Sequence, residues 1–337
     1  MPDPFLKLSA ADRLDALGTA QDERPDYLLE KDVWVVWALE AAFASPFAAD
    51  LAFKGGTSLS KAYGAIRRFS EDVDLTYDVR ALAPDFEGAG DPSAVTDGQA
   101  KKWSKVIRQE RLPAWVAEKM APWLAERVEA EGVPAKVAVH GCDIHLVYEP
   151  ATEAPDYVKT HIKLEFGARD TGEPNLELPV SCYAAPSLPE LIFPSARPRV
   201  VRVERTFWEK ATAAHVFCLR GAFRGADGFA RHWHDLVRLD DAQLAQGAME
   251  SRDIATTVAE HKAKYFAEKA ADGTPVDYRA AVCGGLQLRP EGDAYAVLEA
   301  DYERMVEAGL LLDDAETFVD VMARCDDLQA RANAAAG

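Results

Sequence analysis

The sequence predicts an α+β protein in which a lobe built on a mixed β-sheet precedes a lobe of helices. Three observations lead to this fold class. A strand, helix and strand pattern occupies residues 51–77, further strand patterns occupy most of residues 135–183, and helical patterns dominate after Pro198. Strands and helices that are separated along the chain are typical of α+β folds. We therefore expect one lobe at residues 1–195 and a helical lobe at residues 196–337.

The first lobe is predicted to open with a buried helix over residues 27–44, which Pro46 should end. The next expected elements are a strand at 51–53, a helix at 57–66, a strand at 73–77, a loop at 82–98, and a helical region at 100–131 interrupted at Pro113 and Pro122. Strands should follow at 135–140, 144–148, 157–166 and near 178–183. The helices expected in the second lobe cover residues 204–219, 228–239, 242–269, 293–308 and 315–335.

The composition is that of an acidic globular protein. Of 337 residues 48% are hydrophobic, and Asp plus Glu outnumber Lys plus Arg by 56 to 38, which gives a net charge of -18. A field of this sign repels polyanions, so a nucleic-acid substrate would need local basic patches. The candidate patches are Lys54, Lys61, Arg67 and Arg68, and then Arg197, Arg199, Arg202, Arg205 and Lys210.

The five cysteines are widely spaced and form no C-x-x-C pair, which is typical of reduced thiols. The N-terminus has no signal-peptide pattern, and nowhere do about 18 uncharged apolar residues run together. We therefore expect a cytoplasmic protein that does not enter the membrane.

Two short patterns could carry chemistry. Gly55 and Gly56 lie between a predicted strand and a predicted helix, where backbone N–H groups can approach a phosphate, and the hydroxyls of Thr57 and Ser58 could add hydrogen bonds. The alternative is an ordinary turn with a capping threonine. Asp72 and Asp74, two residues apart on a strand, project from the same face and can share a hard cation such as Mg²⁺.

Together these patterns resemble a known family. The run Gly55–Lys61 followed by Arg68–Leu75 is similar to the first motif of the AbiEii/AbiGii toxins, which are nucleotidyltransferases of the DNA polymerase β superfold. Residues 162–165, 205–212 and 231–236 resemble the later motifs of that family in the same order. His234 departs from the commonest final motif, in which an aromatic residue, often Tyr, occupies this position.

The resemblance implies a polymerase β-like first lobe and a cleft to which the helical lobe contributes Lys210 and Asp235. Catalytic roles are implied for Asp72, Asp74, Glu165, Lys210 and Asp235, with Asp72, Asp74 and Glu165 as the metal ligands. Nucleotide contacts are implied for Gly55, Gly56, Thr57, Ser58, Lys61, Arg68, Ser70 and Lys210.

Each later residue also has a plainer interpretation. Glu165 could pair with Lys163 or Arg169 at a strand edge. Lys210 interrupts an apolar helical stripe, so its ammonium should either reach solvent or meet an anion. Asp235 follows Arg231 by four residues and could form a surface ion pair. We do not expect zinc at His232 and His234, because residues two apart on a helix point to different sides.

The mechanism that follows is transfer of a nucleotide from a nucleoside triphosphate to an acceptor, with Mg²⁺ or Mn²⁺ as the metal. The resemblance further implies a toxin of a phage-defence system, a tRNA 3′ end as the acceptor of some members, and an antitoxin encoded nearby. A small-molecule or protein acceptor is an alternative that the acidic composition favours. A non-catalytic nucleotide-binding protein on the same scaffold is another.

Overall fold

The computed structural model describes residues 3–70, 72–88, 90–153, 159–221, 228–309, 311 and 316–336. The chain divides into two compact units. The first comprises Met1–Ala62, Ser70–Glu87 and Trp103–Val201, and the second comprises Tyr63–Phe69, Gly88–Lys102 and Arg202–Gly337. The second unit therefore contains two short segments that precede its helices by more than a hundred residues in the sequence.

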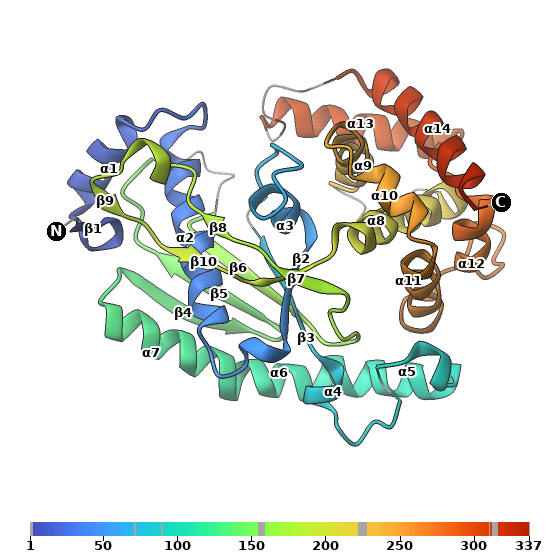
Figure 1. Ribbon diagram of the computed structural model, residues 1–337, viewed down its shortest axis with the longest axis horizontal. Coiled ribbons are helices and arrows are strands. Elements are labelled where there is room, and N and C mark those ends of the chain that lie inside the picture. Colours follow the sequence, from blue (N-terminus) through green and yellow to red (C-terminus); the bar gives the residue numbers. More distant parts are fainter. Residues whose placement is uncertain are drawn as a thin grey trace. The chain divides into compact units, whose positions relative to one another are not determined.

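A seven-stranded sheet forms the centre of the first unit (Figure 1). Its order is β4-β5-β6-β3-β2-β11-β7, and both parallel and antiparallel pairs occur, which confirms the predicted α+β class with a mixed sheet. The strands are β2 (Leu51–Lys54), β3 (Asp72–Tyr77), β4 (Ala135–His140), β5 (Asp143–Tyr148), β6 (His161–Gly167), β7 (Asn175–Glu177) and β11 (Arg199–Val201). Four two-residue strands, β1 (Asp3–Pro4), β8 (Val180–Ser181), β9 (Leu191–Ile192) and β10 (Ser195–Ala196), pair outside it.

One face of this sheet is the core of the unit. Alternate residues of β3, β5 and β6 are buried, as a half-buried strand requires. On that face Tyr148 stacks on Trp34 of α2 (Asp26–Phe43), and Tyr77 stacks on Trp115 of α6 (Leu112–Trp115). The polar residues of the same strands therefore lie on the opposite face.

The helical region before the sheet hairpin differs from its predicted form. It runs from α5 (Asp97–Val106) through α6 to α7 (Ala121–Glu131), and π-helical turns at Ile107–Arg111 and Val116–Met120 join these segments. Pro113 and Pro122 lie at the starts of α6 and α7. In each case a π-helical turn, which is wider than an α-helical turn, comes just before the proline, the residue that has no backbone N–H. The helix therefore continues past both prolines instead of breaking there.

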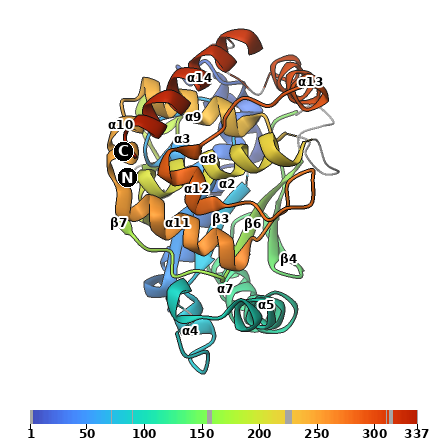
Figure 2. The same ribbon diagram turned by 90° about the vertical axis from the view of Figure 1, so that its right-hand side faces the viewer.

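The second unit is helical, as expected (Figure 2). Helix α8 packs against α9, α10 and α11, and α9 also packs against α14. The bounds are α8 (Val203–Arg220), α9 (Arg231–Asp241), α10 (Ala245–Glu250), α11 (Arg252–Tyr265), α12 (Tyr278–Ala280), α13 (Asp293–Glu307) and α14 (Phe318–Ala334). Among the described residues, the remaining α-helices are α1 (Ala10–Gly18), α3 (Gly55–Lys61) and α4 (Val79–Leu82).

Three predicted elements have different bounds. The helix expected at 57–66 is α3, which ends earlier because Gly64 adopts a left-handed backbone conformation. The helix expected at 242–269 is divided at Ser251, whose backbone is not helical. The strand expected near 178–183 is replaced by the short β7 and β8. Part of the strand expected at 157–166 and part of the helix expected at 315–335 lie outside the described residues.

Within the described part of the chain, no helix combines the length and the apolar character that a membrane crossing requires.

Candidate functional site

The polar face of the first-unit sheet brings together the three predicted carboxylates. Asp74 is paired in register with Glu165 across the parallel strands β3 and β6, and Asp72 is paired with Lys163 in the same way. Register partners point to the same side of a sheet. Asp72 and Asp74 are half-buried, while the side chain of Glu165 is 50% exposed. Asp72 and Asp74 therefore lie on β3, as the predicted alternation requires, and Glu165 lies beside them on the neighbouring strand β6.

Gly55 allows the turn before α3 to lie directly against Asp74. Its φ of +78° suits glycine, and a Cβ added there would lie 2.0 Å from Oδ2 of Asp74. Any side chain at this position would displace the carboxylate. The first glycine of the pair is thus required for the position of Asp74 as well as for the turn itself.

The two hydroxyl residues of this turn are buried and donate to backbone carbonyls. Thr57 Oγ1 donates to the carbonyl oxygen of Asp72 and, at 3.3 Å, to that of Ser70. Ser58 Oγ donates to the carbonyl oxygen of Gly55 over 2.8 Å. Both side chains are 0% exposed. In this structure the hydroxyls join the start of α3 to the start of β3, so a phosphate role for them requires that these bonds be exchanged.

Glu165 forms the ion pair that the plainer interpretation anticipated. Lys163 Nζ lies 2.5 Å from its carboxylate and 3.5 Å from that of Asp143. Desolvation alone would lower the pKa of Lys163, but Glu165, Asp143 and Asp72 together raise it above its usual value. The described residues contain no group of three or more His, Cys, Asp or Glu side chains already arranged as metal ligands.

The same face contains two further donors: Lys54, which the sequence analysis placed only in a candidate basic patch, and Thr76, which it did not name. Lys54 is the register partner of Asp74 on β2, and Thr76 follows Asp74 by two residues on β3. Both donors lie close to Gly167 of β6. Lys54 Nζ and Thr76 Oγ1 are each 3.9 Å from the position that a Cβ on Gly167 would occupy. Thr76 Oγ1 is buried and has no hydrogen-bond partner among the described residues. Strand alternation was the signal that could have found both.

Lys61, for which a nucleotide contact was predicted, forms a buried ion pair in this structure. Its ammonium lies 2.5 Å from Asp32 of α2 and 3.4 Å from the centre of the Tyr183 ring, and its side chain is 3% exposed. Desolvation outweighs these contacts and raises the pKa of Asp32. The structure therefore assigns Lys61 to the attachment of α3 to α2.

In the second unit, a buried cluster joins three more of the predicted residues. Arg68 binds Asp235 through both oxygens, with Nε at 2.6 Å and Nη2 at 2.8 Å, and Lys210 Nζ lies 2.8 Å from the same carboxylate. The Asp235 side chain is 0% exposed. Burial alone would raise the pKa of Asp235, but Arg68 and Lys210 hold it well below its usual range.

This cluster corrects the plainer interpretation of Asp235. Asp235 does not form the surface pair with Arg231 that its spacing allowed, because it faces the interior of the unit. The guanidinium of Arg68 is occupied by Asp235, which makes it a positioning group for that carboxylate. Lys210 lies on the predicted apolar stripe and meets an anion there. The other members of the stripe, Val203, Phe207, Ala214 and Phe217, are all buried.

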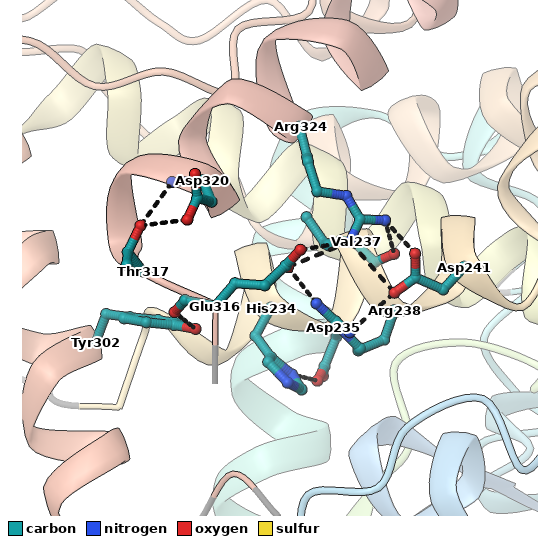
Figure 3. A network of polar contacts seen from close by, with 10 residues as sticks. All are labelled: His234, Asp235, Val237, Arg238, Asp241, Tyr302, Glu316, Thr317, Asp320 and Arg324. Carbon is teal, nitrogen blue, oxygen red and sulfur yellow. Dashed lines mark hydrogen bonds and ion pairs between the residues drawn. The ribbon is translucent and has the colours of Figure 1, made fainter. Parts of the chain in front are cut away.

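Helix α9 is also held by charged side chains one turn further along, as Figure 3 shows. Arg238 of α9 and Arg324 of α14 both bind Glu316, and Arg324 also binds Asp241. His234 Nδ1 lies 3.3 Å from Asp235, so this histidine is a neighbour of the cluster. Burial and the charge of Lys210 lower the pKa of His232 well below its usual value, so this ring is neutral.

The chain resembles known proteins both in its sequence and in its fold. The family model for the nucleotidyl transferase AbiEii toxin of a type IV toxin–antitoxin system matches residues 37–324. Among solved structures, the chain is similar to MenT4, a nucleotidyltransferase toxin from Mycobacterium tuberculosis H37Rv, with 16% identity and a TM-score of 0.50. The match covers 96% of this chain and 89% of that one. No curated protein matches the sequence.

The family match includes the strands with Asp72, Asp74 and Glu165 and the helices with Lys210 and Asp235. The chain therefore belongs to the AbiEii nucleotidyltransferase toxin family.

Proposed function

We propose that this toxin transfers a nucleoside monophosphate from a nucleoside triphosphate to the 3′ end of tRNA. The observation that carries the proposal is the alignment of Asp72, Asp74 and Glu165 on one face of the sheet, with Asp74 lying against the Gly55 turn. Carboxylates crowded on one face repel one another unless a cation is bound. A nucleotidyltransferase uses such a set to hold metal-bound phosphates.

The donor set fits Mg²⁺. This ion prefers oxygen ligands and keeps several waters, so one or two carboxylates together with substrate phosphates are sufficient. Asp72 and Asp74 supply two oxygen ligands of this kind from one strand face. Glu165 would be the third ligand after it releases Lys163. When bound, the cation would neutralise phosphate charge and make the acceptor hydroxyl easier to deprotonate.

The residues around the carboxylates would bind the triphosphate. The first amides of a helix have no partner within the helix, and α3 begins at Gly55 and Gly56, so these amides would face phosphate oxygens. We propose Lys210 as a further phosphate ligand, held ready by Asp235, which Arg68 positions. Thr57, Ser58 and Ser70 would act through the same turn.

In the reaction, the oxygen of the acceptor hydroxyl bonds to the α-phosphorus and its proton is lost to solvent. The bond between the α-phosphorus and the bridging oxygen breaks on the opposite side, and pyrophosphate leaves. The chain's own contribution is to hold the triphosphate and to place opposite charge around the phosphoryl group.

The family places the protein in a type IV toxin–antitoxin system, which supports an antitoxin encoded nearby. A role in phage defence would follow from such a system. The net charge of -18 favours the rival acceptor, a small molecule or a protein, over RNA. The non-catalytic rival would bind the nucleotide without transferring it.

The test is incubation with each nucleoside triphosphate, labelled in turn at the α- and γ-phosphate, with Mg²⁺ and total tRNA. We expect the α-label in RNA and the γ-label in pyrophosphate. Transfer of the α-label to a small molecule or a protein would identify the rival acceptor. Nucleotide binding with no transfer to anything would refute the enzymatic proposal.

A further inference from the structure

Lys54 stands beside the candidate metal ligands on the polar face of the first-unit sheet. It is the register partner of Asp74 on the antiparallel strand β2, and Asp74 is the register partner of Glu165. The Cβ atoms of such antiparallel partners are about 5 Å apart. A lysine side chain at this position therefore has the Asp74 carboxylate within its reach.

The ammonium of Lys54 nevertheless has no carboxylate partner among the described residues. Lys61, Lys163 and Lys210 each lie within 4.0 Å of an aspartate or glutamate oxygen, whereas Lys54 forms no such ion pair in the part of the chain that the structure describes. A lysine that serves as the counter-ion of a structural carboxylate would pair with it, as those three do. The geometry therefore does not support that role for Lys54.

The side chain of Lys54 crosses the neighbouring strand instead. Its Nζ lies 3.9 Å from the position that a Cβ on Gly167 would occupy. Gly167 belongs to β6, and β2 and β6 lie on opposite sides of β3 in the sheet. The side chains along this path are small, because the next row of register partners is Ala52, Thr76 and Gly167. The ammonium therefore lies over the polar face, next to the row that contains Asp74.

A second donor faces the same place. Thr76 Oγ1 also lies 3.9 Å from the Cβ position of Gly167, its side chain is 1% exposed, and it has no hydrogen-bond partner among the described residues. The carbonyl oxygen of Leu75, at the same distance, is an acceptor. Because an ammonium alone has three N–H donors, the donors here outnumber this acceptor. A half-buried surplus of donors beside a positive charge is stabilised by an anion.

The position of Lys54 beside the metal ligands indicates which anion this is. In nucleotidyl transfer the reacting α-phosphate lies at the metal, for which Asp72 and Asp74 are the candidate ligands. The β- and γ-phosphates would lie at the amides of Gly55 and Gly56. Because the Cβ atoms of Lys54 and Asp74 are neighbours, rotation about the side-chain bonds of Lys54 brings its ammonium over Asp74.

We propose that Lys54 binds the α-phosphate of the nucleoside triphosphate, the group that is transferred. This inference rests on the proposed nucleotidyl transfer and adds to it a substrate-binding residue. The ammonium of Lys54 donates to an oxygen of the α-phosphate that does not bridge to the β-phosphate, and no covalent bond to the lysine forms. Its charge then offsets the negative charge of the phosphoryl group during the attack.

The test measures nucleotide binding to the full-length chain by isothermal titration calorimetry in Mg²⁺, without RNA. ATP, CTP, GTP and UTP are titrated in turn, followed by the monophosphate and the nucleoside of the one that binds most tightly. We expect Lys54→Met to raise the Kd of the triphosphate and of the monophosphate at least about tenfold, because a hydrogen bond to a charged group is lost. The Kd of the nucleoside should not change.

Two variants serve as controls. Lys54→Arg keeps the charge and the donors, so each Kd should stay within about threefold of the wild type. Lys136→Met removes the same charge from an exposed position on β4, three strands from β3. That separation is about 14 Å, which is longer than the Debye length of about 8 Å, so every Kd should be unchanged.

Mn²⁺ binding without nucleotide, followed by electron paramagnetic resonance, separates a phosphate role from a structural one. Removal of the Lys54 charge should leave the Kd of Mn²⁺ unchanged or lower it, because a nearby cation repels the metal. If Lys54→Met weakened Mn²⁺ and nucleotide binding together, Lys54 would be a structural residue and the inference would be wrong. Equal nucleotide Kd values for the wild type and Lys54→Met, an effect on the triphosphate alone, or no nucleotide binding by the wild type would also overturn it.

A transfer assay separates this inference from the proposed function. If Lys54→Met weakens nucleotide binding as expected but the wild type transfers no nucleotide, the role of Lys54 stands and the proposed reaction fails. If the wild type transfers nucleotides and Lys54→Met has an unchanged triphosphate Kd and an unchanged kcat, the reaction stands and the role of Lys54 is wrong. A lower kcat together with a higher triphosphate Kd supports both.

Discussion

Replacing Asp235 by asparagine should destabilise the helical unit far more than neutralising Lys210. The asparagine side chain would keep the shape of the aspartate but would leave Arg68 and Lys210, whose side chains are only 7% and 8% exposed, without their carboxylate. Removing one partner of a buried ion pair costs about 3–5 kcal/mol, because the remaining charge stays desolvated. The Asp235→Asn variant should lose stability of this order.

The Lys210→Met variant leaves Asp235 bound to Arg68 through both of its oxygens. The loss should therefore be about 1.5–3 kcal/mol, the value of one hydrogen bond to a charged group. Native-state hydrogen exchange of the α8 and α9 amides measures the free energy of opening at this place. Both variants should lose nucleotidyl transfer, so the pair separates the structural role of Asp235 from the phosphate role of Lys210.

The reasoning would be refuted if Asp235→Asn opened no more easily than the wild type, or if Lys210→Met were equally damaging. The pH dependence of stability offers an independent check of the direction in which the pKa of Asp235 is shifted. Because the folded pKa of Asp235 lies below its unfolded value, its contribution is fully present above the usual aspartate pKa and is lost only as pH falls through the lower, folded pKa. This contribution should therefore be constant between about pH 5 and 8.

Three further changes test other parts of the account. Gly55→Ala should remove transfer activity, because the added Cβ displaces the Asp74 carboxylate. The control is Gly98→Ala, which should keep the activity because a Cβ there meets nothing within 4 Å. Equal activities of the two variants would contradict the steric argument. Thr76→Val should raise the free energy of unfolding by about 1 kcal/mol in urea, because it removes a buried hydroxyl that has no partner among the described residues; a loss of stability would mean that this hydroxyl is bonded. His215 accepts a hydrogen bond from the Gln287 amide, and burial lowers the pKa of His215 to about 4. The neutral ring therefore contributes fully to the free energy of unfolding above pH 6.5, and this contribution is lost as pH falls through about 4. Between these limits His215→Gln should remove about 3 kcal/mol of pH dependence from the unfolding free energy, and an unchanged pH profile would contradict it.

Local patterns predicted the features that depend on local spacing. Alternation placed Asp72 and Asp74 on one strand face, and the 3.6-residue period placed Lys210 among buried apolar side chains. Both follow from the geometry of a single element. The bounds of α3 and the division at Ser251 were missed because one backbone conformation, at Gly64 or at Ser251, decides them.

Partners distant in the sequence could not be predicted in this way. Lys61 was expected to bind a nucleotide because it follows the Gly-Gly turn, but its counterion Asp32 lies on another helix. Arg68 and Asp235 are separated by 167 residues, so no periodicity connects them. The place of Lys54 beside Asp74 requires the register of β2 and β3, which a single sequence does not specify.

The central claim is that the carboxylates of β3 support nucleotidyl transfer. Its most direct test compares the wild type with Asp74→Asn for transfer of α-labelled nucleoside triphosphate in Mg²⁺, with circular dichroism confirming that both are folded. The account predicts transfer by the wild type and a loss of at least about a thousandfold in the variant, since a metal ligand contributes several kcal/mol to the transition state. Transfer by a folded Asp74→Asn protein at the wild-type rate would contradict it.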